Sequence, residues 1–153
     1  MNFADRLTHF LKGVDDYINL KNLSPTKFNA EFAIAETFSI DQMGRLTREE
    51  CLDYAYMLYQ YADHIASERA TNQTVVNWCE SNLGSIVASE IQEMSGEFLK
   101  HDVKVATIVR THELANKINE WKLTAQARLE PLKSRENNVR RKAEILLEKG
   151  RRK

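Results

Sequence analysis

Apolar residues along this chain recur at intervals of three and four positions, the spacing that places side chains on one face of an α-helix. The first such stretch lies within residues 1–20 and predicts an amphipathic helix whose apolar face needs a partner. A second helix should follow Ser24 and Pro25, because serine is a common N-cap and proline suits the first helical position. We expect this helix to end before Gly44, so that residues 1–45 form a helical pair.

The middle of the chain carries the longest uninterrupted helical pattern. It begins at Thr47, whose hydroxyl can accept a hydrogen bond from the amide of Glu50 while the Glu50 carboxylate reaches back to the amide of residue 47. As one helix, the residues from there to 94 would span about 70 Å at 1.5 Å per residue. We therefore predict that residues 46–99 form one long helix, or two nearly collinear helices broken near Thr71 or Gly84.

The last third of the chain, residues 100–153, again shows helical spacing. Asp102 is the predicted N-cap of its first helix. Pro131 lies within the pattern and should kink the helix or start a new one, because proline lacks an amide hydrogen and clashes with the preceding turn. Gly150 is expected to end the last helix before a basic tail.

Composition supports an all-α fold. The 153 residues include only five glycines and two prolines, and 42% of them are apolar, so the chain can bury one core but has few breaks for turns. We expect a single domain spanning 1–153, built of long amphipathic helices in an extended helical bundle. The long apolar stripes exceed what one extended chain could cover, so we also expect a homo-oligomer.

The sequence offers no sign of membrane insertion or export. The chain has no apolar run near the roughly 18 residues that a transmembrane helix needs, and its first residues lack the basic and hydrophobic regions of a signal peptide. Cys51 and Cys79 are 28 positions apart, without the spacing of a zinc site or a disulfide framework. We therefore expect a cytoplasmic protein with two buried thiols and no membrane partner.

The formal net charge of zero hides a strong polarity along the chain. Residues 1–98 contain 7 Lys or Arg against 15 Asp or Glu, whereas residues 99–153 contain 15 against 7. A basic half of this kind is typical of proteins that bind nucleic acid or another polyanion. Packing of the acidic half against the basic half, or against another subunit, is the alternative.

Several classes of chemistry lack their sequence signatures. The four histidines form no HExxH motif, and no Glu-x-x-His pair of a di-iron bundle occurs. Nucleotide-binding glycine motifs are absent, and neither cysteine has a histidine close by in sequence that could activate it. We therefore predict a protein that binds rather than catalyses, with no cofactor and no metal.

The strongest candidate site is basic and C-terminal. Residues 128–153 contain ten Lys or Arg against four Glu, and such a cluster can neutralise phosphates without reading sequence. Slightly upstream, Trp121 lies between two lysines, a combination that single-strand binders use to stack bases; the alternative is that Trp121 belongs to the core. The predicted nucleic-acid-binding residues are Lys117, Trp121, Lys122, Arg128, Lys133, Arg135, Arg140, Arg141 and Lys142.

From about Leu52 to Lys149 the chain resembles the small helical recombination mediators of T4-like phages, the UvsY type. The resemblance lies in helix order, charge layout and three stretches: Tyr54, Tyr56, Tyr59 and Tyr61; Phe98-Leu99-Lys100-His101-Asp102; and Leu132-Lys133-Ser134-Arg135. It implies a non-enzymatic accessory protein that forms a ring-like homo-oligomer and binds single-stranded DNA. It further implies that the protein helps a RecA-like recombinase replace a single-strand-binding protein.

Two other functions fit the same charge pattern. A helical small subunit of a nucleoprotein effector complex would show the same polarity but bind nucleic acid poorly alone. A protein-binding adaptor or inhibitor of phage origin would use the acidic half or an apolar stripe. The sequence leaves these open beside single-stranded nucleic-acid binding.

Overall fold

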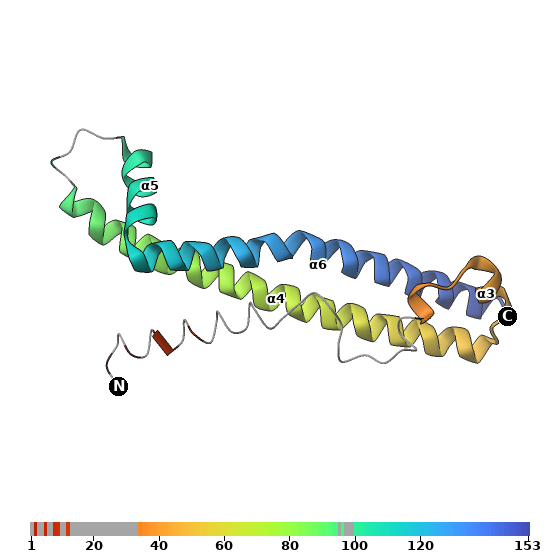
Figure 1. Ribbon diagram of the computed structural model, residues 1–153. Helices are drawn as coiled ribbons and strands as arrows, with labels where there is room; N and C mark the ends of the chain where they lie inside the picture. The colour runs from red at the N-terminus through yellow and green to blue at the C-terminus, as the bar shows by residue number, and fades with distance from the viewer. Residues whose placement is uncertain are drawn as a thin grey trace. The chain divides into compact units, whose positions relative to one another are not determined.

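The computed structural model describes residues 34–94, 96 and 100–153, together with positions 2, 5, 8, 9 and 12. It contains α3 (Ile40–Arg45), α4 (Arg48–Glu93), α5 (His101–Thr111) and α6 (Glu113–Arg151), labelled in Figure 1, and no strand among the described residues. The all-α prediction is confirmed. The predicted helix within residues 1–20 and the start of the second helix lie outside the continuously described ranges.

Helix α4 begins as the sequence predicts. Thr47 Oγ1 accepts a hydrogen bond from the Glu50 amide at 3.1 Å, and the Glu50 carboxylate accepts one from the Thr47 amide at 3.1 Å. Each of the two side chains therefore satisfies an amide that the first helical turn leaves without a backbone partner. The helix then continues without a break to Glu93, so of the two alternatives for residues 46–99 the single long helix is correct.

The helical stretch that ends at Glu36 stops before Gly44, as expected, but a short helix that the sequence analysis does not predict follows it. Residues 34–36 are helical, but a turn follows, and Ser39 starts a new short helix, α3, that contains Gly44. The Ser39 hydroxyl accepts from the Gln42 amide, and the Gln42 side chain accepts from the Ser39 amide, at 3.1 and 2.8 Å. This second capping box favours a helix start where the apolar spacing alone suggests continuation.

Two predicted boundaries in the C-terminal part also need correction. The N-cap of α5 is Lys100, without a side-chain hydrogen bond, and Asp102 lies in the first turn, where its charge still suits the helix dipole. Of the two expectations for Pro131, the start of a new helix is wrong, because α6 runs through it to Arg151, and a kink stays a prediction. Pro131 is exposed, so the carbonyl that loses its helical partner can bond to water, while packing on both sides maintains the helix.

The chain divides into two compact units, and both long helices contribute to each. Unit 2 comprises Leu23–Ala70 and Leu129–Lys153. Its core lies between α4 and α6, with Leu58 and Tyr61 facing Val139 and Leu146, all at most 1% exposed. Contacts such as Cys51 with Gly150 and Asp63 with Arg140 show that the two helices run antiparallel here. The prediction of one domain spanning 1–153 stays a prediction.

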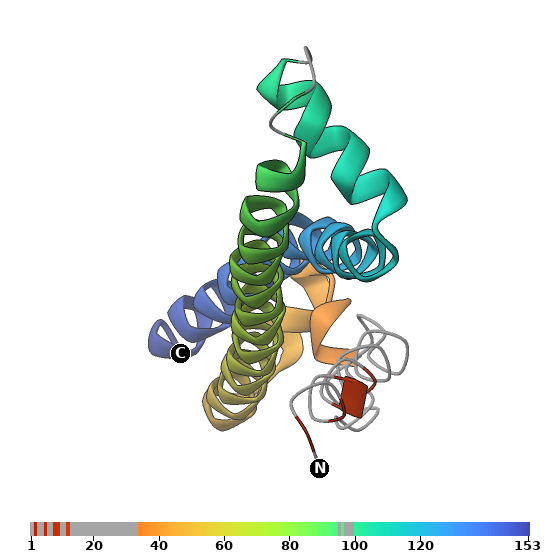
Figure 2. The same ribbon diagram turned by 90° about the vertical axis from the view of Figure 1, so that its left-hand side faces the viewer.

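Unit 1 comprises Met1–Asn22 and Thr71–Arg128. Within it, α5 follows the end of α4 and leads through a sharp turn into α6, as Figure 2 shows. Its buried residues come from all three helices and are mainly apolar. They include Val76, Cys79 and Leu83 of α4, Ile108 of α5, and Ala115, Ile118, Trp121 and Ala125 of α6.

Gly150 has a different role from the one expected. It is a buried residue inside α6, and a Cβ added there would lie 3.0 Å from the Cβ of Cys51. The absence of a side chain therefore lets the last turn of α6 approach the first turn of α4 closely. The glycine does not end the helix.

None of the helices in the described part of the chain is long and apolar enough to cross a membrane.

Candidate nucleic-acid interface

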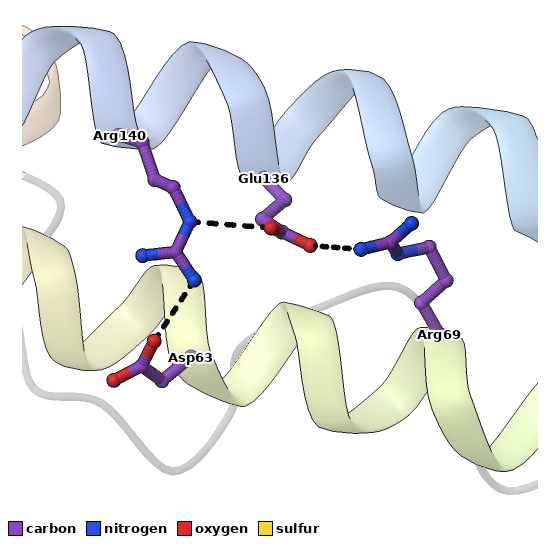
Figure 3. Close-up of polar contacts among 4 residues, drawn as sticks. All are labelled: Asp63, Arg69, Glu136 and Arg140. Carbon is purple, nitrogen blue, oxygen red and sulfur yellow. Dashed lines mark hydrogen bonds and ion pairs between the residues drawn. The ribbon is translucent and has the colours of Figure 1, made fainter.

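Some basic side chains of α6 point towards α4 and form hydrogen bonds at the interface between the two helices. Glu136 is only 7% exposed, and its two oxygens accept hydrogen bonds from Arg69 of α4 at 2.8 Å and from Arg140 at 3.2 Å. Arg140 also donates to Asp63 of α4 at 2.9 Å (Figure 3). The hydrogen bond with Asp63, together with Glu136, raises the pKa of Arg140. This network links α4 to α6. It engages Arg140, which the sequence analysis predicts to bind nucleic acid.

Arg135 is held in a second group of contacts inside unit 2. Its Nε donates to the hydroxyl of the buried Tyr61 at 2.7 Å, and its Nη2 donates to Glu36 at 3.2 Å. Burial acts to lower the pKa of Arg135, but Tyr61 and Glu36 outweigh it and raise the pKa. For Tyr61, burial raises the pKa, partly offset by Arg135. Arg135 therefore also has an internal role, although 40% of its side chain remains exposed.

The basic residues at the end of α6 have intramolecular partners as well. Arg151 and Arg152 lie 3.3 and 4.0 Å from Glu148 on the same helix. The Lys153 ammonium donates to the carbonyls of Met43 at 2.9 Å, Gly44 at 3.1 Å and Leu46. Because these carbonyls belong to the end of α3, the lysine satisfies and neutralises the negative end of that helix.

Three predicted cations remain on the outer surface of α6. Lys133, Arg141 and Lys142 are exposed, and among the described residues none of them takes part in a hydrogen bond or ion pair. With other exposed hydrogen-bond donors, these cations form two adjacent rows along the helix surface, in which successive residues are four positions apart. We call this set the donor band: Lys133, Asn137 and Arg141 in one row, and Ser134, Asn138 and Lys142 in the other.

No acidic residue of α6 belongs to the donor band. Between Lys133 and Lys142 the only acidic residue is Glu136, which faces α4 and is shared by two arginines. Exposed Glu130 and Glu144 lie just outside the band. Each row extends about 12 Å along the helix axis, because its first and last residues are eight positions apart. The band therefore offers three cations, two amides and one hydroxyl to a ligand rich in negatively charged oxygen atoms.

The predicted residues upstream lie in unit 1. Trp121 is 5% exposed and packs in the core of that unit, with the Lys117 ammonium 5.5 Å from the centre of its ring. Lys117 is itself 3.9 Å from Glu120, while Lys122 and Arg128 are half-buried. As folded, the indole has no open face for a nucleic-acid base. The structure thus groups Lys133, Arg141 and Lys142, directs Arg135 and Arg140 inward, and places the other four in unit 1.

Sequence reasoning missed two kinds of residue in this region. Ser134, Asn137 and Asn138 complete the donor band, and their i, i+4 relation to the cations could have identified them. The acceptors Glu36 and Asp63 had no comparable signal, because they lie 99 and 77 positions from the arginines that they bind.

The described residues hold no other site with evident chemistry. No group of three or more His, Cys, Asp or Glu among them is arranged to hold a metal ion. Both cysteines are buried, and burial raises the pKa of the Cys79 thiol to about 11, which keeps it protonated at neutral pH.

Comparison of the chain with models of protein families, with curated proteins and with solved structures gives no match.

Proposed function

We propose that the protein binds single-stranded nucleic acid through the donor band, without catalysing a reaction. The observation that carries this proposal is the separation of the cations on α6. Arg135 and Arg140 are bound to acceptors within the fold, whereas Lys133, Arg141 and Lys142 face solvent with no carboxylate among them. Unpaired cations on a rigid helix can neutralise phosphates and release counterions.

The chemistry of the band favours a nucleic acid over an acidic protein surface. Arg and Lys, together with Ser and Asn, are the side chains that contact the phosphates and sugars of nucleic acids. The band carries no exposed aromatic residue, so binding through it should not depend on sequence. A flexible single strand can adjust the spacing of its phosphates to the two rows, and we therefore propose the single strand as the ligand.

Beyond this activity, we propose that the protein acts in the cytoplasm as a homo-oligomer. We further propose that it is an accessory in recombination, loading a RecA-like recombinase in place of a single-strand-binding protein. The support for this role is the resemblance in helix order and charge layout, together with the continuous α4 and α6 of the fold.

One observation favours a second function, that of a protein-binding adaptor. The solvent face of α4 in unit 2 is acidic and carries Tyr56, which is 65% exposed between Asp53 and Gln60. Exposed tyrosines are enriched in protein interfaces, where the ring contributes contact area and the hydroxyl a hydrogen bond. A basic protein would be the expected partner of this surface.

The experiment that tests the proposed function is a titration of a labelled oligo-dT strand, measured by fluorescence anisotropy at two salt concentrations. The wild type is compared with the triple variant Lys133→Gln, Arg141→Gln, Lys142→Gln. We expect the triple variant to bind about tenfold or more weakly at low salt and to melt at the same temperature as the wild type. Equal affinity of the two proteins would contradict the proposal and favour the adaptor.

A further inference from the structure

A small hollow in unit 2 lies between α6 and the segment that precedes α4. Glu36, Phe38 and Met43 line it from that segment, and Lys142, Ile145 and Leu146 line it from α6. Lys142 is a member of the donor band, and Glu36, which lines the hollow, accepts a hydrogen bond from Arg135. Arg135, Asn138 and Lys142 have i, i+3 and i+7 spacing, so they share one flank of α6.

We propose that Arg135 and Lys142 form a phosphate subsite at the edge of the donor band, and that Glu36 occupies this subsite until nucleic acid displaces it. The inference rests on the proposed function, because the ligand is a phosphate of the same bound strand. Glu36 then acts as an intramolecular competitor. A carboxylate and a phosphate oxygen accept the same charge-assisted hydrogen bonds from a guanidinium, so each can replace the other.

The contacts of Arg135 suit such an exchange. Its Nε is fixed by the Tyr61 hydroxyl at 2.7 Å, and the ring of Tyr61 lies 5.5 Å from the guanidinium carbon. When Glu36 leaves, these contacts keep the guanidinium in place with Nη2 free to donate. The Arg135 side chain is 40% exposed and that of Glu36 is 17% exposed, so a ligand can reach the arginine from solvent.

The segment that carries Glu36 is held by few buried contacts. In residues 34–46 only Ala35 is buried, and α3 buries none of its residues. Phe38 packs edge-on against Tyr54 with ring centres 4.9 Å apart, and Lys153 holds the carbonyls at the end of α3. Release of the carboxylate therefore does not require the α4–α6 core to open.

The test compares two glutamates of unit 2, one that binds Arg135 and one that does not. Glu36 binds Arg135, whereas Glu144 is exposed and, among the described residues, has no hydrogen bond or ion pair. We expect Glu36→Gln to tighten binding of labelled oligo-dT about threefold to tenfold at low salt, because a neutral amide competes poorly for the guanidinium. Glu144→Gln changes net charge equally and should alter the affinity less than about twofold.

A second pair of variants keeps the net charge constant. Glu36→Asp shortens the side chain by one methylene, so its carboxylate is drawn away from Arg135, and we expect tighter binding again. Glu144→Asp should leave the affinity unchanged. The gain from Glu36→Gln should disappear when Arg135→Gln is also present, and a melting curve of each variant verifies folding.

The outcomes separate this inference from the proposed function. If the wild type binds and the Glu36 variants behave like the Glu144 variants, the subsite is wrong while the donor band stands. A gain from Glu36→Gln that persists with Arg135→Gln also overturns the subsite. If Glu36→Gln binds oligo-dT and the wild type does not, the result supports a complete block of the subsite by Glu36. If no protein binds, both proposals are overturned.

Discussion

The two parts of α6 are stabilised in different ways. In unit 1, Ile118, Trp121 and Ala125 pack into a core whose buried side chains, among the described residues, are apolar except for Asn72. In unit 2, α6 also packs through apolar residues, but the buried Glu136 and its two arginines link it to α4. The same helix therefore contributes packing in one unit and packing with charge pairing in the other.

This difference shows that a basic residue on α6 need not be a ligand-binding residue. In a low-dielectric interface, a buried carboxylate needs its cations, so we expect Arg69 and Arg140 to contribute to the stability of the fold. The neighbouring Arg141 has the same chemistry but faces solvent. The structural role of a cation on this helix is decided by the face on which it lies.

The largest effect is expected in the apolar core of unit 1. Trp121→Ala should lower the free energy of unfolding by about 3–5 kcal/mol, because it leaves a cavity where a buried ring was. Thermal or urea unfolding followed by circular dichroism measures this loss. Leu123→Ala is the control, since that side chain is 55% exposed on the same helix, and its cost should stay within about 0.5 kcal/mol.

A smaller loss is expected from the polar link of unit 2. Glu136→Gln removes the charge that Arg69 and Arg140 share, and we expect a cost of about 2 kcal/mol in urea unfolding. Both arginines are about one-third exposed and regain some hydration, which limits the cost. Glu144→Gln should be neutral. Equal stability of the two variants would mean that the network adds nothing to the interface.

A buried thiol in the core of unit 1 should also make the free energy of unfolding decrease at alkaline pH. Burial raises the pKa of the Cys79 thiol from 9.0 to about 11, so the folded state holds this proton more tightly than the unfolded state. The contribution is complete below pH 9 and is lost as pH rises towards 11. We expect a loss on the order of 1 kcal/mol from this group over that range. The free energy of unfolding of Cys79→Ala should fall less steeply with pH than that of the wild type. Parallel curves for the two proteins would argue against the raised pKa of Cys79.

A loss of stability of similar or smaller size is expected from the N-cap of α4. Thr47→Ala removes the hydroxyl that accepts from the Glu50 amide, and should cost about 1 kcal/mol. Ser39→Ala removes the matching contact from α3, which buries no residue, so the melting temperature should change less. A larger effect at Ser39 than at Thr47 would mean that α3 is more important to the fold than its exposure indicates.

Sequence patterns predicted those features that depend on neighbouring residues. The helical period gave the all-α class, and Thr47 with Glu50 located the start of α4. Pro131 does not start a new helix, because packing on both sides maintains α6 through it, whereas the alternative expectation of a kink stays a prediction. The prediction that Gly150 ends the helix failed because the sequence does not show its close contact with Cys51, about a hundred positions away. That contact, and not a helix end, explains why a glycine suits this position.

The candidate site was predictable as a charge cluster but not as a surface. Sequence shows that Arg140 and Arg141 are both basic, and it does not show that Asp63 and Glu136 bind the first of them. The helical period alone places adjacent residues about 100° apart. Combined with the apolar face of α6, it could have separated inward from outward cations, had Glu136 been recognised as part of the buried face.

The most direct test of the account uses these two adjacent arginines. Arg140→Gln and Arg141→Gln make the same chemical change on two different faces of one helix, about 100° apart. For each, the affinity for labelled oligo-dT is measured across a series of salt concentrations, beside its melting temperature. We predict that Arg141→Gln reduces the slope of log affinity against log salt by about 0.7 with unchanged melting, whereas Arg140→Gln keeps the slope and melts several degrees lower. Equal slopes for the two variants would contradict the division of α6 into a structural face and a binding face.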